Sequence, residues 1–171
     1  MSRTIVAYFS RSGENYVSGS IIDLPVGNTE VAAGYVRDAT GGDIFRIETI
    51  SPYPENYSAC TGQAQAEKRA DARPQLVDLG PDMSGYDTVY LGYPNWCGTV
   101  PMAVLTFLEA HDFSGKRILP FCTNEGSGMG SSDSDIRKAC PGAEVGRGLS
   151  ITGGSVKGSR PAVEGWVKSN Q

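Results

Sequence analysis

Two short polar segments carry the side chains of this sequence that are best suited to bind an anion. Ser10–Gly13 follows an apolar run that is typical of a strand, and Gly27–Glu30 opens a helical pattern. Joined together, they would form a turn that leads from a strand into a helix. Main-chain N–H groups of such a turn, the positive end of the helix dipole and hydroxyl groups all favour a bound anion. We therefore predict an anion site formed by Ser10, Arg11, Ser12, Gly13, Asn28 and Thr29.

The kind of anion follows from what these two segments lack. They contain neither the lysine of the G-x-x-x-x-G-K loop of nucleoside triphosphatases nor the glycines of the G-x-G-x-x-G dinucleotide motif. Hydroxyl and main-chain N–H groups suit a phosphate monoester better than a triphosphate with magnesium. The sequence therefore predicts a phosphate monoester at this site.

The segment Glu14–Gly27 separates the two halves of the predicted site. In one interpretation it is an excursion, after which Asn28 and Thr29 complete the site, because Thr29 stands where the helix and its dipole begin. In the alternative, Glu14 and Asn15 line the phosphate and Thr29 only caps the helix. The excursion itself is either a flap over the ligand or a tolerated surface insertion.

Length, composition and charge limit the class of protein. A chain of 171 residues with 39% apolar and 20% charged residues is expected to form one soluble domain, residues 1–171. The net charge of −4 disfavours nucleic acid and anionic membrane as partners, since both need a basic face. The run Ile5–Phe9 is too short for a membrane span or a signal-peptide core. We therefore expect a cytoplasmic protein, unless a leader has been removed.

The cysteines offer no pattern of redox or metal chemistry. Cys60, Cys97, Cys122 and Cys140 form no C-x-x-C pair, and His111 is the single histidine. These spacings disfavour a zinc site and a thioredoxin-like dithiol. We expect no bound metal and thiols that are buried or merely tolerated.

Alternating strand-like and helical segments must position the polar loops. Apolar runs predict strands at Thr4–Phe9, Asp43–Ile47, Asp87–Gly92, Arg117–Cys122 and Val145–Ile151, the last of them broken by glycines. Helical spacing and capping residues predict helices at Val31–Ala39, Ser58–Ala72 and Ser131–Cys140 and helices that begin at Pro101 and Pro161. This order predicts an α/β fold in three layers, an open doubly wound parallel sheet of five strands.

In such a sheet, ligands lie beyond the carboxyl ends of the strands, where the strand order reverses. The segments that directly follow strands are Ser10–Gly13, Tyr93–Thr99 and Thr123–Ser131, and each is rich in Gly, Ser, Thr or Asn. We therefore expect these three loops to meet at one site.

The sequence resembles the flavodoxin family over essentially its whole length. The resemblance rests on the first loop, "YFSRSG…NT", on "GYPNWCGTVP" and on "TNEGSG" after the fourth strand. It implies the strand order 2-1-3-4-5 and noncovalently bound FMN, with the phosphate in the first loop and the isoalloxazine ring between the other two. The ring contacts that it implies are Pro94, Asn95, Trp96, Cys97, Gly98, Thr123, Asn124, Glu125, Gly126 and Gly128.

The resemblance also suggests roles for individual residues. Trp96 would stack on the flavin ring, and Gly98 would let the neighbouring peptide reorient at low cost when the flavin is reduced. Glu125 either lowers the potential of the flavin through its charge or points to solvent. Tyr53 and Tyr57 are expected in a surface turn rather than at the site.

Three functions are compatible with these features. The first is an FMN-binding electron-transfer protein, a monomer or weak dimer that carries one or two electrons between redox partner proteins. The second is an FMN-dependent NAD(P)H oxidoreductase that acts on quinones or nitro compounds, although no nicotinamide-binding motif is visible. The third is a module that keeps the fold but has lost the flavin. We expect the first, with a partner protein or a nicotinamide-dependent reductase as the electron donor.

Overall fold

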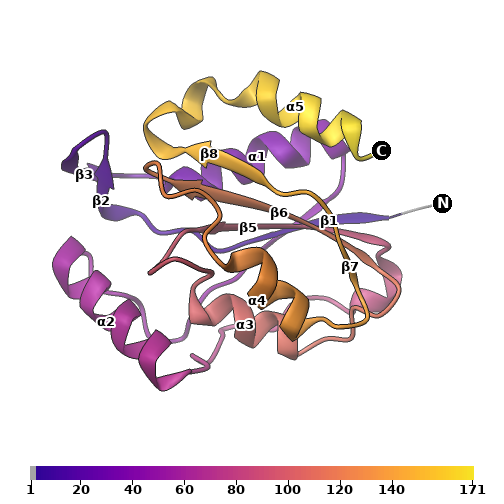
Figure 1. Cartoon of the computed structure of the whole chain (residues 1–171), viewed down its shortest axis with the longest axis horizontal. Coiled ribbons are helices and arrows are strands. Elements are labelled where there is room, and N and C mark those ends of the chain that lie inside the picture. The colour runs from indigo at the N-terminus through magenta and orange to yellow at the C-terminus, as the bar shows by residue number, and fades with distance from the viewer. Residues whose placement is uncertain (1–2) are drawn as a thin grey trace.

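The computed structural model of the chain describes residues 3–171, and its centre is a twisted parallel sheet (Figure 1). The strands of this sheet are β1 (Thr4–Tyr8), β4 (Asp43–Arg46), β5 (Thr88–Pro94), β6 (Arg117–Asn124), β7 (Glu144–Val145) and β8 (Leu149–Thr152). They are arranged in the order β4-β1-β5-β6-β7, and β8 also pairs with β6. All of these pairs are parallel. The predicted order 2-1-3-4-5 is confirmed when β7 and β8 are taken together as the fifth strand.

Helices cover both faces of the sheet, as the predicted three-layer fold requires. Helices α1 (Asn28–Thr40) and α5 (Arg160–Ser169) lie on one face, and α3 (Met102–Glu109) and α4 (Ser132–Ala139) lie on the other (Figure 1). Helix α2 (Tyr57–Ala70) stands beside the end of the sheet at which the first loop lies. Two short 3₁₀ segments, η1 (Met83–Gly85) and η2 (Gly153–Gly158), complete the described elements.

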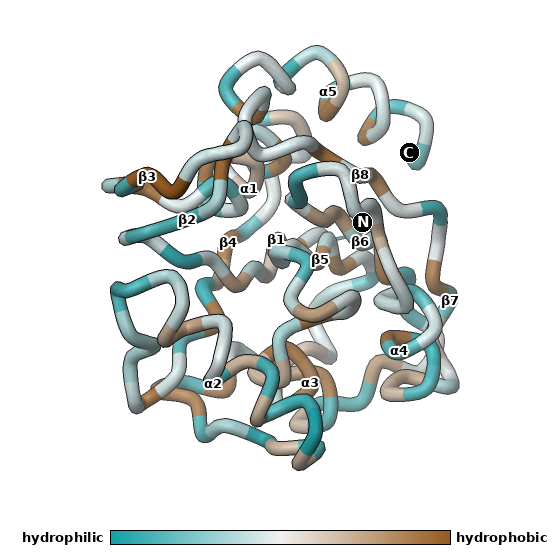
Figure 2. Tube along the Cα trace, turned by 60° about the vertical axis from the view of Figure 1, so that its left-hand side comes forward, coloured by the Kyte–Doolittle hydropathy of each residue, from teal (hydrophilic) through white to brown (hydrophobic). Residues whose placement is uncertain are grey.

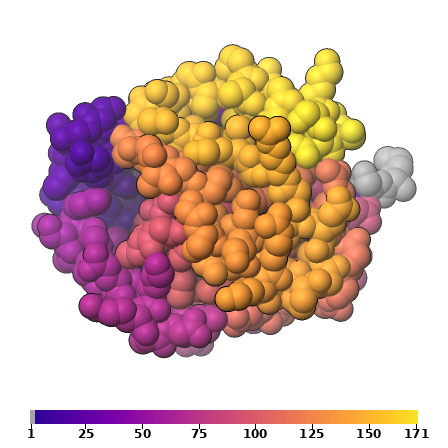
Figure 3. All heavy atoms as spheres, viewed as in Figure 1, coloured from indigo at the N-terminus to yellow at the C-terminus, as the bar shows by residue number. Residues whose placement is uncertain are grey.

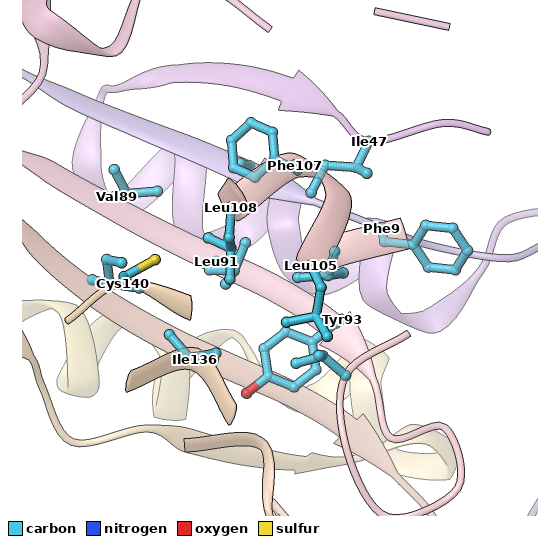
Figure 4. Close-up of a cluster of buried hydrophobic side chains, with 14 of the residues drawn as sticks. Phe9, Ile47, Val89, Leu91, Tyr93, Leu105, Phe107, Leu108, Ile136 and Cys140 are labelled. Atoms are coloured by element: carbon cyan, nitrogen blue, oxygen red, sulfur yellow. The ribbon is translucent and has the colours of Figure 1, made fainter. Parts of the chain in front are cut away.

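Each face of the sheet has its own hydrophobic core, because successive side chains of a strand point to opposite faces. Along β5, Val89, Leu91 and Tyr93 pack toward α3 and α4, whereas Tyr90 packs toward α1 and α5. Figure 4 shows the first of these cores, in which Phe107 and Leu108 of α3 meet strand side chains. The strands are buried on both faces, which explains why the sequence shows continuous apolar runs.

The fifth strand is two short strands instead of one. Ile118 pairs with Val145 and Phe121 pairs with Leu149, so one extra residue lies in the edge strand between them. The interruption between β7 and β8 lies beside Pro120, which has no N–H group to donate to a regular ladder of hydrogen bonds between strands. Gly148 passes so close that a Cβ atom there would be 3.2 Å from the carbonyl oxygen of Pro120. The glycines in the predicted strand therefore mark a bulge that bypasses the proline.

The segment after the first loop forms an antiparallel hairpin of β2 (Gly13–Val17) and β3 (Ser20–Leu24). A two-residue turn with positive φ at Ser18 (52°) and Gly19 (85°) joins the strands, as right-handed twist favours. The sequence predicts an excursion here, and the excursion is confirmed, but its strand structure is not predicted. Figure 2 shows β3 as a hydrophobic segment on the outside of the molecule.

Within residues 3–171, no helix combines the length and the apolar character needed to cross a membrane. The four cysteines are free, and three of them are buried. The described part of the chain contains no group of three or more His, Cys, Asp or Glu side chains that could hold a metal ion.

Candidate functional site

The three predicted loops meet at a pocket at the carboxyl ends of the central strands. The pocket has a volume of about 250 Å³. Figure 3 shows the surface at this end of the molecule, where the hairpin, helix α2 and the loop after β6 come together at the left. The predicted residues on its wall are Ser10, Arg11, Asn28, Thr29, Pro94, Asn95, Trp96, Cys97, Thr123, Asn124 and Glu125.

The other predicted residues lie beside the pocket and shape its loops. These are Ser12, Gly13, Gly98, Gly126 and Gly128, none of which is on the wall. Asn124 Oδ1 accepts hydrogen bonds from the N–H groups of Gly126 (2.9 Å) and Gly128 (3.1 Å). These glycines therefore contribute through their main chain to the shape of the third loop.

The structure adds a wall that the sequence analysis did not assign to the site. It consists of Asn15, Tyr16, Tyr57, Cys60, Thr61, Ala64, Ser127 and Gly153. Half of these residues lie on α2 at the spacing i, i+3, i+4, i+7, which is one face of a helix. That spacing is visible in the sequence, but only the tertiary structure shows that this face covers the pocket. Tyr57 thus lines the pocket and does not belong to a surface turn.

Ser10 joins the two halves of the predicted anion site. Its Oγ accepts a hydrogen bond of 3.0 Å from the N–H of Glu30, in the first turn of α1. The residue at the helix cap, Gly27, has no side chain that could do this. Ser10 therefore caps α1 from the other side of the hairpin, and its own hydroxyl proton is left for another acceptor.

Thr29 joins the first loop to the third. Its Oγ1 lies 2.7 Å from Oγ1 of Thr123, and both residues are buried. One of the two hydroxyl protons lies between the oxygens, so the pair retains one proton to donate. The N–H groups of Asn28 and Thr29 stand in the first turn of α1, where a helix offers no acceptor. The pocket therefore gathers neutral donors at the positive end of a helix dipole.

Arg11 is held by main-chain carbonyl groups. Its guanidinium group donates to the oxygens of Glu14, Pro54 (2.7 Å) and Glu55 (2.6 Å). These bonds tie the first loop to the segment that leads into α2. The Nε atom of Arg11 is buried and has no acceptor among residues 3–171.

The second loop contains a tight turn. Trp96 and Thr99 exchange both of their main-chain hydrogen bonds, at 2.9 and 3.2 Å. Between them, Cys97 and Gly98 have φ values of 56° and 86°, as in a type I′ turn. Gly98 suits this geometry, whereas Cys97 adopts a left-handed conformation that side chains disfavour.

Both ends of the peptide between Cys97 and Gly98 are held. The ammonium group of Lys68, on α2, donates to the carbonyl oxygen of Cys97 at 2.5 Å. The N–H of Gly98 donates to Oδ1 of Asn95 at 2.9 Å. A reorientation of this peptide, which the glycine alone would permit, must therefore break two hydrogen bonds.

Aromatic side chains flank the pocket. Trp96 makes edge contacts with Phe9 (ring centroids 5.1 Å apart) and Tyr53 (4.9 Å), which fix its indole ring. Tyr16 and Tyr57 lie together with a centroid distance of 6.4 Å. Burial, followed by the hydrogen bond to Glu67, raises the pKa of Tyr53. The pocket therefore offers uncharged aromatic surfaces to a planar ligand.

Glu125 and Cys60 complete the pocket wall. The carboxylate of Glu125 accepts hydrogen bonds from the N–H groups of Ser18 and Gly154 (3.1 Å). Both of its oxygens are therefore engaged within the protein. Burial raises the pKa of the Cys60 thiol, although Arg11 partly opposes this shift. Cys60 therefore remains a protonated thiol and acts as part of the wall.

Comparison with known proteins identifies the family. The sequence profile described as "Flavodoxin" matches residues 3–170. The chain belongs to the flavodoxin family. Membership of this family supports FMN as the cofactor. The neutral donors at the N-terminus of α1 also fit the phosphate monoester of FMN. No protein with a curated description matches the sequence.

Solved structures agree with this family. A candidate flavoprotein from Bacteroides uniformis is 27% identical, with 98% of each chain covered and a TM-score of 0.77. One from Bacteroides eggerthii is 26% identical, with 99% of this chain and 98% of the other covered and a TM-score of 0.79. A flavoprotein from Lactobacillus acidophilus, solved in complex with FMN, is 16% identical, covers 92% of this chain and 98% of its own, and has a TM-score of 0.65. The last similarity shows the fold alone.

Proposed function

We propose that this flavodoxin-family protein binds FMN and carries one or two electrons between redox partner proteins. Bound FMN supplies the electron chemistry, while the chain binds and orients it. The observation that carries the proposal is the set of neutral donors around Ser10, Thr29 and Thr123 at the N-terminus of α1. These donors suit the phosphate of FMN, and a phosphate oxygen near Arg11 would also give its buried Nε–H an acceptor.

The other two loops are proposed to hold the isoalloxazine ring. Trp96 and the Tyr16–Tyr57 pair provide aromatic surface. The turn at Cys97–Gly98, whose peptide is held by two hydrogen bonds, presents main-chain groups at the edge of the pocket. The sixteen residues predicted from the sequence are retained in this proposal. Ser12, Gly13, Gly98, Gly126 and Gly128 act in it through the shape of their loops.

A reductase that uses NAD(P)H is the second candidate. The same fold occurs in an NADH:FMN oxidoreductase and in a candidate quinone reductase from Klebsiella pneumoniae. Against it, the charged groups on the wall, Arg11 and Glu125, are both engaged in hydrogen bonds within the protein. Only the Nε–H of Arg11 lacks an acceptor, and the proposed FMN phosphate would take it, so the phosphates of a nicotinamide cofactor would find no further cation on the described wall. This favours a carrier that receives electrons from a partner protein.

Retention of flavin tests the proposal. The purified protein is mixed with excess FMN or with riboflavin, passed through a desalting column and examined by visible absorption. We expect retained FMN in a one-to-one ratio and loss of riboflavin, because riboflavin lacks the phosphate. Equal retention of both, or of neither, would contradict the proposed phosphate site. Reduction by NADH alone, with turnover of a quinone, would favour the reductase over the carrier.

A further inference from the structure

The β2–β3 hairpin has little support of its own. Within residues 3–171 its two strands pair only with each other and form a sheet separate from the central one. Of residues 13–24, only Val17 is buried, and Ile21 and Ile22 are 52% and 40% exposed. A two-stranded hairpin is at best marginally stable in water. The hairpin must therefore be held in place by its contacts with the rest of the protein.

The base of the hairpin is bound to the segment that opens α2. Glu14 donates its N–H to the oxygen of Glu55 (3.1 Å), and its side chain accepts the N–H of Tyr57 (2.9 Å), the first residue of α2. The guanidinium group of Arg11 bonds to carbonyl oxygens on both sides of this junction. The base thus has several hydrogen bonds that are independent of the third loop.

The tip of the hairpin, next to the buried Val17, is hydrogen-bonded to one side chain of the third loop. The carboxylate of Glu125 accepts the N–H of Ser18 with one oxygen and the N–H of Gly154 with the other. It therefore links the hairpin turn to the start of η2. Ser18 lies directly against Gly154, where an added Cβ atom would be 3.5 Å from the Cβ atom of Ser18.

Between base and tip, the hairpin passes over the pocket. Asn15 and Tyr16, in the middle of β2, are both on the pocket wall together with Asn28 of the phosphate end. When the tip leaves Glu125 while the base stays on α2, the ring contact of Tyr16 with Tyr57 is what still holds this part of the wall, so the strand beyond it is free to move away. Local opening has a low cost where few apolar contacts are broken.

We propose that the hairpin is a strap across the phosphate end of the pocket, with Glu125 as the positioning residue that keeps it closed. The strap controls how fast the cofactor enters and leaves, and it opens at Ser18 while its base remains attached to α2. This inference rests on the proposed binding of FMN. The state of the strap can nevertheless be measured without FMN.

The first test compares Glu125→Gln with Glu164→Gln. Both lose one negative charge, but Glu164 is exposed on α5, away from the pocket. The amide that replaces the Glu125 carboxylate can accept through only one oxygen, so one of the two N–H groups loses its acceptor. We expect the Ser18 amide of the FMN-free protein to exchange hydrogen roughly tenfold faster in Glu125→Gln, and FMN to dissociate faster by a similar factor. Equal exchange and release rates in both variants would overturn the proposal.

The second test closes the strap covalently. A Cβ–Cβ distance of 3.5 Å between positions 18 and 154 lies within the range of disulfides. In Ser18→Cys/Gly154→Cys loaded with FMN, we expect oxidation to slow FMN release at least tenfold and dithiothreitol to restore it. The wild-type protein, treated in the same way, controls for the four native thiols. If the oxidised and reduced forms of the variant release FMN at the same rate, with the cross-link confirmed by mass spectrometry, the proposal is overturned. Failure of the cross-link to form would also overturn it.

The two proposals fail in different ways. If the wild-type protein retains no FMN, the proposed function is wrong, but exchange at Ser18 still reports whether Glu125 holds the strap. If FMN is retained and neither the variant nor the cross-link changes its release, the function stands and the strap is wrong.

Discussion

The hydroxyl oxygens of Thr29 and Thr123 lie 2.7 Å apart inside the protein, although the residues are far apart in the sequence. Thr29 is the second residue of α1 and Thr123 is the penultimate residue of β6, so this hydrogen bond joins the first and third loops of the pocket. Thr29 is only 2% exposed and Thr123 only 5%, so both hydroxyls are buried polar groups that need a hydrogen-bond partner.

Thr29→Val should therefore destabilise the protein even without FMN. The valine leaves the Thr123 hydroxyl buried without its partner, at a cost of about 1–3 kcal/mol. Thr29→Ser, which keeps the hydroxyl, should stay within about 1 kcal/mol of the wild type. Urea unfolding of the FMN-free protein measures both. If the free energy of unfolding of Thr29→Val equals that of the wild-type protein, the hydrogen bond between Thr29 and Thr123 adds nothing to stability.

Ser10→Ala should weaken both helix α1 and phosphate binding. The variant loses the acceptor for the N–H of Glu30, which should cost about 1 kcal/mol of stability. It also loses a hydroxyl donor to a charged group, about 1.5–3 kcal/mol of FMN affinity. Ser12→Ala is the matched control, because Ser12 is exposed and off the pocket wall. FMN titration of the two variants should separate them, and equal affinities would place the phosphate elsewhere.

The sequence predicts the sheet because the pattern that defines it is local. The apolar run that contains β1 and the helical spacing of α1 are each readable within a few residues. The order of loops after strands then brings Ser10, Asn95 and Thr123 to one end of the sheet. This explains why eleven of the sixteen predicted residues lie on the wall of one pocket.

The remaining features depend on contacts between segments far apart in the chain. Nothing near Lys68 indicates that its ammonium group holds the carbonyl of Cys97. Likewise, the two strands of the hairpin depend on base contacts with Glu55 and tip contacts with Glu125. Such partners are fixed by tertiary structure, so the sequence predicts an excursion but not its shape.

Lys68→Met should free the peptide between Cys97 and Gly98. Without the ammonium donor, only the bond from Gly98 to Asn95 opposes reorientation. A lost hydrogen bond to a charged group is worth about 1.5 kcal/mol, which corresponds to a shift on the order of 60 mV in a one-electron potential. Spectroelectrochemical titration of the FMN-loaded protein measures the two potentials. Lys68→Arg should restore the wild-type values, and Lys168→Met on α5 controls for charge. Potentials that do not move in Lys68→Met would mean that the peptide is held by other contacts.

Stability should fall at high pH because of Tyr93. Burial raises the pKa of this tyrosine above its usual value near 10, so the folded state retains a proton that the unfolded chain releases. The stabilisation is complete below about pH 10 and decreases above it by up to about 1.4 kcal/mol per pH unit. Urea unfolding between about pH 9 and pH 11 should show this slope, and Tyr93→Phe should make it shallower. The same slope in both proteins would assign the alkaline loss to other groups.

Gly27 closes the split loop, and an added methyl group there should open it. A Cβ atom at this position would be 2.6 Å from the carbonyl oxygen of Arg11 and would also collide with Oγ of Ser10. Gly27→Ala must therefore push the first loop away from the start of α1, which separates the hydroxyl and N–H donors of the phosphate site. Gly34→Ala, within the helix that Gly27 caps, is the control, because no atom beyond its chain neighbours and the helix's own backbone lies within 4 Å of its added Cβ. That substitution should stabilise the protein by about 0.5–1 kcal/mol. We expect Gly27→Ala to lose FMN on the desalting column while Gly34→Ala retains it, and retention by Gly27→Ala would show that the two halves of the loop need not meet.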